Sequence, residues 1–156
     1  MGWTCPDANC SRFTSRVPAL YEDWSREIRV RHDRIIFSLF LNSAAACLKL
    51  TNGVTDAKTL RLYATRIQEG LQNALDIDAE SFYIATTAER GKLLYRLARS
   101  YGLCGHWYEA GENILKALKY APKDPAVAKF LRRVATEGGF DLGARERTSS
   151  LLALAD

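Results

Sequence analysis

Apolar residues recur every three or four positions over most of the chain, and no segment shows the convincing alternation of a β-strand. The clearest run advances by 3, 4, 4, 3 and 1 positions, which is the stripe of an amphipathic helix. Its members are Leu60, Tyr63, Ile67, Leu71, Ala74 and Leu75. We therefore predict an all-α fold built from antiparallel helical hairpins.

Turn residues mark the ends of the first two predicted helices. Residues 20–50 form one helix, or two joined near residues 31–33, because apolar side chains recur there without a breaker. The sequence Thr-Asn-Gly at 51–53 stops this helix, since glycine is common just after a helix end. Thr55 or Asp56 caps a second helix, and residues 76–85 form a connection.

The second half of the chain carries further helix signals. Thr86 and Glu89 form a T-x-x-E capping box, which predicts a helix that runs to about residue 103. Two more helices are predicted over 107–120 and 125–137. Four aromatic residues are expected to pack in the core or between the helical hairpins, namely Trp24, Trp107, Tyr108 and Phe130.

Residues 91–124 match the tetratricopeptide pattern, a helical hairpin of about 34 residues. Small residues at positions 8, 20 and 27 of this pattern let two helices approach closely, and larger residues at positions 7, 11 and 24 fill the gap. Leu94 departs from the pattern, because tryptophan is common at the fourth position. The six matching residues are Leu97, Ala98, Tyr101, Ala110, Ile114 and Ala117.

An earlier repeat is predicted over 36–79, where aligning Asn42 with Arg96 puts Ala44 and Cys47 at positions 8 and 11. Asn42 and Arg96 are 54 positions apart, 20 more than one period. We assign about 11 of these extra residues to the paired helices, as roughly one and a half turns on each. The remaining parts are a flexible arm (1–16), a degenerate helical segment (17–35), a capping helix (125–137) and a tail (138–156).

Within residues 36–135, the stretches FLNSAAACLKL, ALDID and KLLYRLARSYGLCGHWYEAGENILKALKYAPKDPAV resemble the tetratricopeptide domains of chaperone-associated proteins. That group includes the large immunophilins, the cyclophilin-type isomerase with such a domain, and the chaperone-organising co-chaperones. In the family, three repeats and a capping helix bind the extreme C-terminal peptide of a heat-shock chaperone. The resemblance implies a non-catalytic interaction module that holds this acidic peptide in a concave groove.

The resemblance also assigns carboxylate-binding residues. Asn42 matches the clamp asparagine of the second repeat, and Lys92 and Arg96 match the clamp lysine and arginine of the third. Lysine supplies a point charge and arginine a planar fork for a carboxylate. Lys92, Arg96 and Arg99 are spaced i, i+4 and i+7 and so share one helical face. Lys49 lies two turns beyond Asn42 and could add charge to the groove.

The lysine and asparagine of the family's first repeat have no counterpart here. One period upstream of the second repeat, the matching positions hold Thr4 and Ala8, and no lysine precedes Lys49. The first repeat is therefore expected to be missing, degenerate or removed by truncation. The alternative function is a structural or assembly module without a carboxylate clamp, part of a larger protein or self-associating through an apolar face at the N-terminal end of the stack.

Composition and motifs narrow the other classes of function. A net charge of +4 over 156 residues is too weak to indicate nucleic-acid binding, and no apolar run is long enough to span a bilayer. Cys5 and Cys10 lack the further ligands of a tetrahedral metal site. No phosphate loop or nucleophile elbow occurs. We expect no enzyme activity, cofactor, metal, nucleic acid or membrane partner, and a cytoplasmic location by default.

Overall fold

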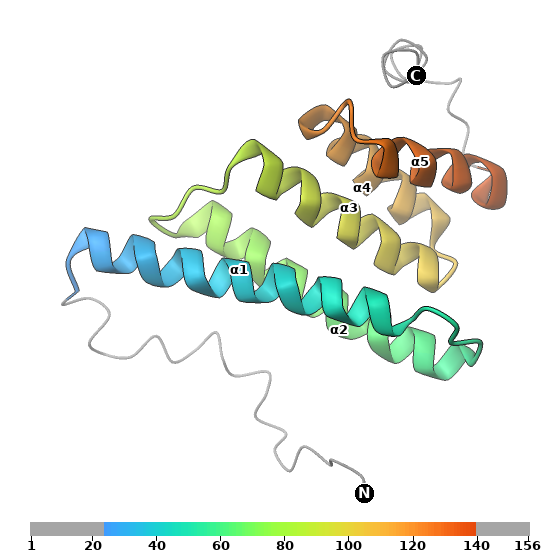
Figure 1. Cartoon of the computed structure of the whole chain (residues 1–156), viewed down its shortest axis with the longest axis horizontal. Coiled ribbons are helices and arrows are strands. Elements are labelled where there is room, and N and C mark those ends of the chain that lie inside the picture. The colour runs from blue at the N-terminus through green and yellow to red at the C-terminus, as the bar shows by residue number, and fades with distance from the viewer. Residues whose placement is uncertain (1–23, 140–156) are drawn as a thin grey trace, which may run out of the picture.

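A computed structural model describes residues 24–139, which form helices and short connections with no strand. The predicted all-α class is therefore confirmed. The predicted arm at 1–16 and all but two residues of the predicted tail lie outside the described residues. The helices are α1 (Arg26–Leu50), α2 (Ala57–Glu80), α3 (Thr87–Leu103), α4 (Trp107–Tyr120) and α5 (Pro125–Gly138) (Figure 1).

Side-chain caps fix the starts of four helices, and in α1 the Ser25 hydroxyl accepts a hydrogen bond from the backbone N–H of Ile28. The Asp56 carboxylate accepts a hydrogen bond from the backbone N–H of Thr59 at 2.7 Å and so caps α2. The predicted capping box of Thr86 and Glu89 is present at the start of α3. Asp124 caps α5, which begins with proline, a residue suited to a first helical turn because its missing N–H is not needed there. These polar residues satisfy backbone groups that a helix end leaves open.

The helix bounds differ from the prediction in three places. α1 begins at Arg26 rather than near residue 20, because Trp24 and Ser25 lie outside the helix and Ser25 caps it. α2 continues to Glu80, so the connection to α3 spans only 81–86 rather than 76–85. α1 is continuous through residues 31–33 and through the predicted boundary at residue 35. The extra length of the first hairpin over the second is also distributed unevenly. α2 has 24 residues and α4 has 14. α1 is longer than α3 as well, but its additional residues precede Asn42.

α1, α3 and α5 lie on one side of the molecule, toward the viewer in Figure 1, and α2 and α4 lie behind them. α1 packs against α2, and α3 against α4. The second helix of each pair also contacts the helix that follows it, so that α2 packs on α3 and α4 packs on α5. α3 additionally contacts both α1 and α5. The first helices of successive hairpins therefore form one continuous face.

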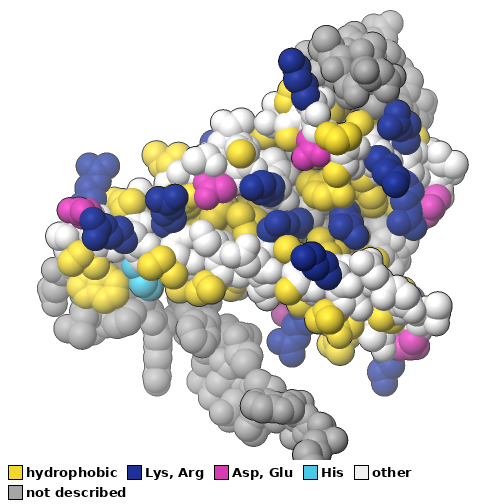
Figure 2. Space-filling model, viewed as in Figure 1, with side chains coloured by type: hydrophobic (Ala, Val, Ile, Leu, Met, Phe, Trp, Pro, Cys, Tyr) yellow, Lys and Arg dark blue, Asp and Glu magenta, His cyan; other side chains and the backbone are white. Residues whose placement is uncertain are grey.

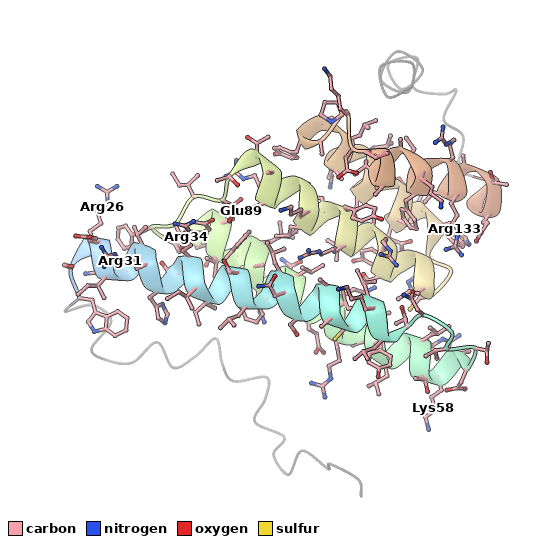
Figure 3. The ribbon with its side chains drawn as sticks, in the orientation of Figure 1. Arg26, Arg31, Arg34, Lys58, Glu89 and Arg133 are labelled. Atoms are coloured by element: carbon pink, nitrogen blue, oxygen red, sulfur yellow. The ribbon has the colours of Figure 1, made fainter. Side chains whose placement is uncertain are left out.

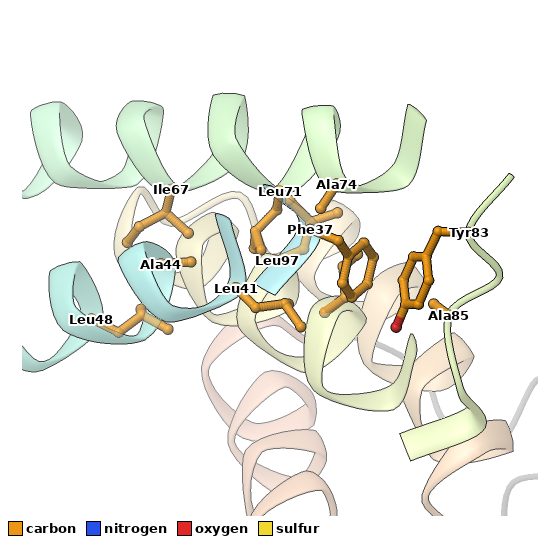
Figure 4. Close-up of a cluster of buried hydrophobic side chains, with 11 residues drawn as sticks. Phe37, Leu41, Ala44, Leu48, Ile67, Leu71, Ala74, Tyr83, Ala85 and Leu97 are labelled. Carbon is orange, nitrogen blue, oxygen red and sulfur yellow. The ribbon is translucent and has the colours of Figure 1, made fainter. Parts of the chain in front are cut away.

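Two clusters of buried side chains hold the helices together. The first joins α1, α2, the 81–86 connection and α3, and Figure 4 shows Phe37 and Tyr83 packed side by side within it, with ring centroids 5.3 Å apart. The second joins α3, α4 and α5 around Ile114 and Leu131. Leu94 and Tyr101 of α3 pack against both clusters, so α3 is the shared element of the fold.

The four aromatic residues expected to pack in the core or between the hairpins differ in their burial. Trp24 is half-buried and makes an edge-to-face contact with His32 of α1, with ring centroids 5.3 Å apart. Phe130 is buried and Trp107 is half-buried, whereas Tyr108 has 69% of its surface exposed. Trp107 shares the α4 face of the buried residues Ala110 and Ile114, because these positions are three and seven residues away. Tyr108 is one residue further along and is turned off this face, so the expectation that it packs in the core was wrong.

Candidate functional site

Three basic residues form a row along one face of α3, which we call the α3 basic stripe: Lys92, Arg96 and Arg99. Lys92 is exposed, and the other two are half-buried. The opposite side of α3 carries the buried Leu93, Leu97 and Ala98, so the amphipathic pattern of the helix turns the stripe away from the core. Figure 2 shows Lys and Arg side chains gathered over the middle of the face formed by α1, α3 and α5.

Arg96 lies in the seam between α3 and α1. Its Nη1 atom donates a hydrogen bond to the backbone carbonyl of Leu41 at 2.7 Å. Burial lowers the pKa of the guanidinium below its ordinary value, although an arginine remains charged at any physiological pH. A guanidinium has five N–H donors, so the bond to Leu41 leaves others for a second acceptor.

Asn42, the α1 residue predicted to bind a carboxylate together with Arg96, is next in sequence to Leu41. Asn42 is exposed and directly follows Leu41, whose carbonyl receives the Arg96 bond. Asn42 and Arg96 are thus brought into one neighbourhood although 54 positions separate them. Lys49 is also exposed but lies in the last turn of α1, about 10 Å further along the helix axis. Only an extended ligand would reach both Asn42 and Lys49.

Tyr95 connects the α3 basic stripe to α5, and the sequence prediction missed it. The Cζ atom of Arg99 lies 5.9 Å from the centroid of the Tyr95 ring, a distance at which the ring face attracts a cation. Tyr95 in turn makes an edge-to-face contact with Phe130 of α5 at 6.2 Å. The i, i+4 spacing of Tyr95 and Arg99 is the signal that could have identified this pair.

The positive charge of the α3 basic stripe is not compensated by nearby acids. Among the described residues, no ion pair involves Lys92, Arg96 or Arg99. On α5, by contrast, Arg133 pairs with Glu137 at 2.8 Å. A carboxylate would match both the charge of the stripe and its arginine geometry.

Three further expectations from the sequence concern the first repeat, a metal site and a membrane span. Thr4 and Ala8 lie outside the described residues. Between residues 24 and 139, no group of three or more His, Cys, Asp or Glu side chains is arranged to hold a metal ion. No helix in that part of the chain has both the length and the apolar content to cross a membrane.

No protein-family model, curated protein or solved structure matches this chain. The class that fold and site define directly is an all-helical protein with a basic face.

Proposed function

We propose that the chain is a non-catalytic, cytoplasmic interaction module of the tetratricopeptide type, which binds an acidic C-terminal peptide such as the tail of a heat-shock chaperone. The peptide lies along the face of α1, α3 and α5. Lys92 and Arg96 hold its terminal carboxylates, Asn42 donates an amide hydrogen bond, and Lys49 and Arg99 contact the preceding acidic residues.

One observation carries this proposal. The Arg96 guanidinium bridges α3 and α1 beside Asn42, and no acidic side chain of the described residues pairs with it or with Lys92. A half-buried charged group such as the Arg96 guanidinium is partly desolvated, and a bound carboxylate offsets that cost. The bond to Leu41 also holds the guanidinium in place before a ligand arrives, which lowers the entropy lost on binding.

The test is a calorimetric titration with an acidic peptide that has a free C-terminus and with its amidated twin. We expect tighter binding of the free acid, because charge-assisted hydrogen bonds contribute roughly 1.5–3 kcal/mol each. Lys92→Ala should therefore weaken binding roughly 10- to 150-fold. Arg96→Lys, which keeps the charge but loses the planar fork, should weaken it less than Arg96→Ala.

Lys116→Ala is the matched control, since Lys116 is also an exposed lysine but lies on α4, outside the proposed groove. It should leave both affinities unchanged. Equal binding of the free and amidated peptides, or equal affinity of the Lys92→Ala and Lys116→Ala variants, would contradict the carboxylate clamp.

A second function is favoured by a different observation. α1 exposes several large apolar side chains at the N-terminal end of the helix stack, which suits a structural or assembly module that packs against another protein surface. In that case the acidic peptide would bind weakly or not at all, and the apolar residues of α1 would determine the interaction.

A further inference from the structure

The side of α5 that borders α3 carries two exposed cations, Lys129 and Arg133. Phe130 contacts α3, and successive residues of a helix are about 100° apart around its axis. At this spacing Lys129 and Arg133 lie to one side of Phe130, and Val127 and Leu131 lie to the other. Val127 and Leu131 are buried in the second core cluster, so the two cations lie along the outer edge of the seam between α3 and α5.

α5 approaches α3 closely at this seam. A Cβ atom at Gly102 of α3 would lie 3.0 Å from the Phe130 ring and 3.2 Å from the Trp107 ring, so the missing side chain leaves room for both rings. The Cζ atom of Arg133 lies 5.7 Å from the centroid of the Trp107 ring, and Glu137 pairs with Arg133 at 2.8 Å and offsets its charge. Figure 3 shows the Arg133 side chain extending from α5 toward the C-terminal end of α3. The cations of α5 therefore belong to the same face as the α3 basic stripe.

Arg99 and Lys129 lie on the two sides of an aromatic pair. The Arg99 guanidinium lies over the Tyr95 ring, and Tyr95 makes its edge-to-face contact with Phe130, the neighbour of Lys129 in the sequence. In the part of the chain that the structure describes, no carboxylate pairs with Arg99 or Lys129. Two cations without a carboxylate partner in residues 24–139 thus flank the seam, one on each helix.

We propose that Arg99 and Lys129 form a second anion subsite, which binds an acidic side chain located about three residues before the C-terminal residue of the peptide. This inference rests on the proposed binding of the terminal carboxylates at the seam between α1 and α3. Neighbouring helices pack about 8–10 Å apart, so the seam between α3 and α5 lies about that far from the first seam. An extended chain advances about 3.3 Å per residue and covers this distance in about three residues.

The subsite gives the module a preference for one side chain of the peptide in addition to its preference for a free C-terminus. Asn42, Lys92 and Arg96 contact the terminal carboxylates and do not distinguish the residues that precede them. An exposed ion pair adds little affinity in water, whereas like charges at the same place repel, so such a pair selects among ligands more than it tightens binding. A bound peptide therefore crosses α3 from the α1 side to the α5 side with an acidic side chain over the second seam.

The test is a fluorescence-anisotropy titration of the full chain with three labelled heptapeptides that end in a free aspartate. They differ only three residues before the last one, where they carry Glu, Gln or Lys. We expect the wild type to bind the Glu peptide most tightly and the Lys peptide least. Lys129→Ala should reduce the preference for Glu over Gln by roughly two- to five-fold, which is the effect of one exposed ion pair. Lys129→Glu should reduce it further and bind the Lys peptide more tightly than the wild type does, a gain that a misfolded variant cannot give.

Two controls separate this subsite from the carboxylate clamp. Lys116→Glu changes the net charge as much as Lys129→Glu does, at an exposed lysine of α4, and should leave the three affinities in their wild-type ratio. Lys92→Ala should weaken binding of all three peptides by the same factor. If amidation of the C-terminus weakens binding while Lys129→Glu keeps the wild-type preference, the subsite is overturned and the clamp stands. A wild-type chain that binds none of the three peptides would overturn both.

Discussion

Arg96 has a structural contact with α1 and a proposed role in binding a carboxylate. Its bond to the Leu41 carbonyl ties α3 to α1, and its remaining donors belong to the proposed carboxylate site. Lys92, one turn earlier on the same face, is exposed and makes no such tie. A substitution at Arg96 should therefore lower both the peptide affinity and the stability of the fold, whereas one at Lys92 should lower the affinity alone.

Arg96→Ala should lower the free energy of unfolding by about 1–3 kcal/mol, because it removes a charged donor and leaves the helix seam less well packed. Lys92→Ala should change it by no more than about 0.5 kcal/mol, as exposed substitutions usually do. Urea unfolding at neutral pH measures both. Arg66→Ala, at an exposed arginine on α2, is the control. An Arg96→Ala variant as stable as Arg66→Ala would show that the tie contributes nothing.

The residues of this site were predictable to different extents. The amphipathic spacing of Lys92, Arg96 and Arg99 is enough to place them on one face of α3. The tie between Arg96 and Leu41 was not predictable, because it depends on how closely two helices approach across 55 positions of sequence. Helical periodicity describes a face and contains no information on that distance.

At the scale of elements, the 81–86 connection is held by two carboxylates. Asp78 accepts two hydrogen bonds from the Arg90 guanidinium, at 2.7 and 3.0 Å, and one from the backbone N–H of Ala85 at 2.7 Å. Glu89 accepts from the Tyr83 hydroxyl at 2.6 Å and from Thr86. Burial, followed by this bond to Glu89, raises the pKa of Tyr83 to about 12. The connection is thus an ordered junction between α2 and α3.

Burial alone would raise the pKa of Asp78, but the bonds from Arg90 and Ala85 outweigh it and hold the pKa below its ordinary value. The stabilisation is therefore present above the unfolded-state pKa of about 4 and is lost as the pH falls through the lower, folded-state pKa. We expect Asp78→Asn to be less stable than wild type at neutral pH and to lose less stability on acidification.

Thermal melting at neutral pH and near pH 3 would test this expectation. Asp76→Asn is the control, because Asp76 lies on the same helix, is exposed and accepts a hydrogen bond only from Gln72 among the described residues. Parallel acid profiles for wild type and Asp78→Asn would refute the role of Asp78.

The two halves of this junction differ in how far they could be predicted. The capping box of Thr86 and Glu89 is a local pattern of four residues, and the structure confirms it. The pairing of Asp78 with Arg90 was missed because residues 76–85 were expected to form a connection. The local sequence pattern does not predict that α2 continues to Glu80. The path of the chain after Glu80 is fixed by tertiary packing, because Tyr83 and Ala85 are buried in the first core cluster.

At the scale of the whole molecule, α3 is the element that couples the unfolding of the two core clusters. A stack of helical hairpins is stabilised by each unit and by the contacts between neighbours. Leu94 and Tyr101 are the α3 side chains that pack against both clusters, so they provide much of the coupling between the N-terminal and C-terminal hairpins.

Leu94→Ala should therefore uncouple the hairpins as well as destabilise them. Native-state hydrogen exchange should show similar opening free energies for the slowest amides of α2 and α4 in the wild type, and different ones in the variant. Leu75→Ala and Leu115→Ala are the controls, because these partly buried leucines each pack against a single cluster. They should lower stability without separating the two helices. If Leu94→Ala leaves α2 and α4 exchanging together, the coupling does not depend on Leu94 and must reside in Tyr101 or in the backbone packing of α3.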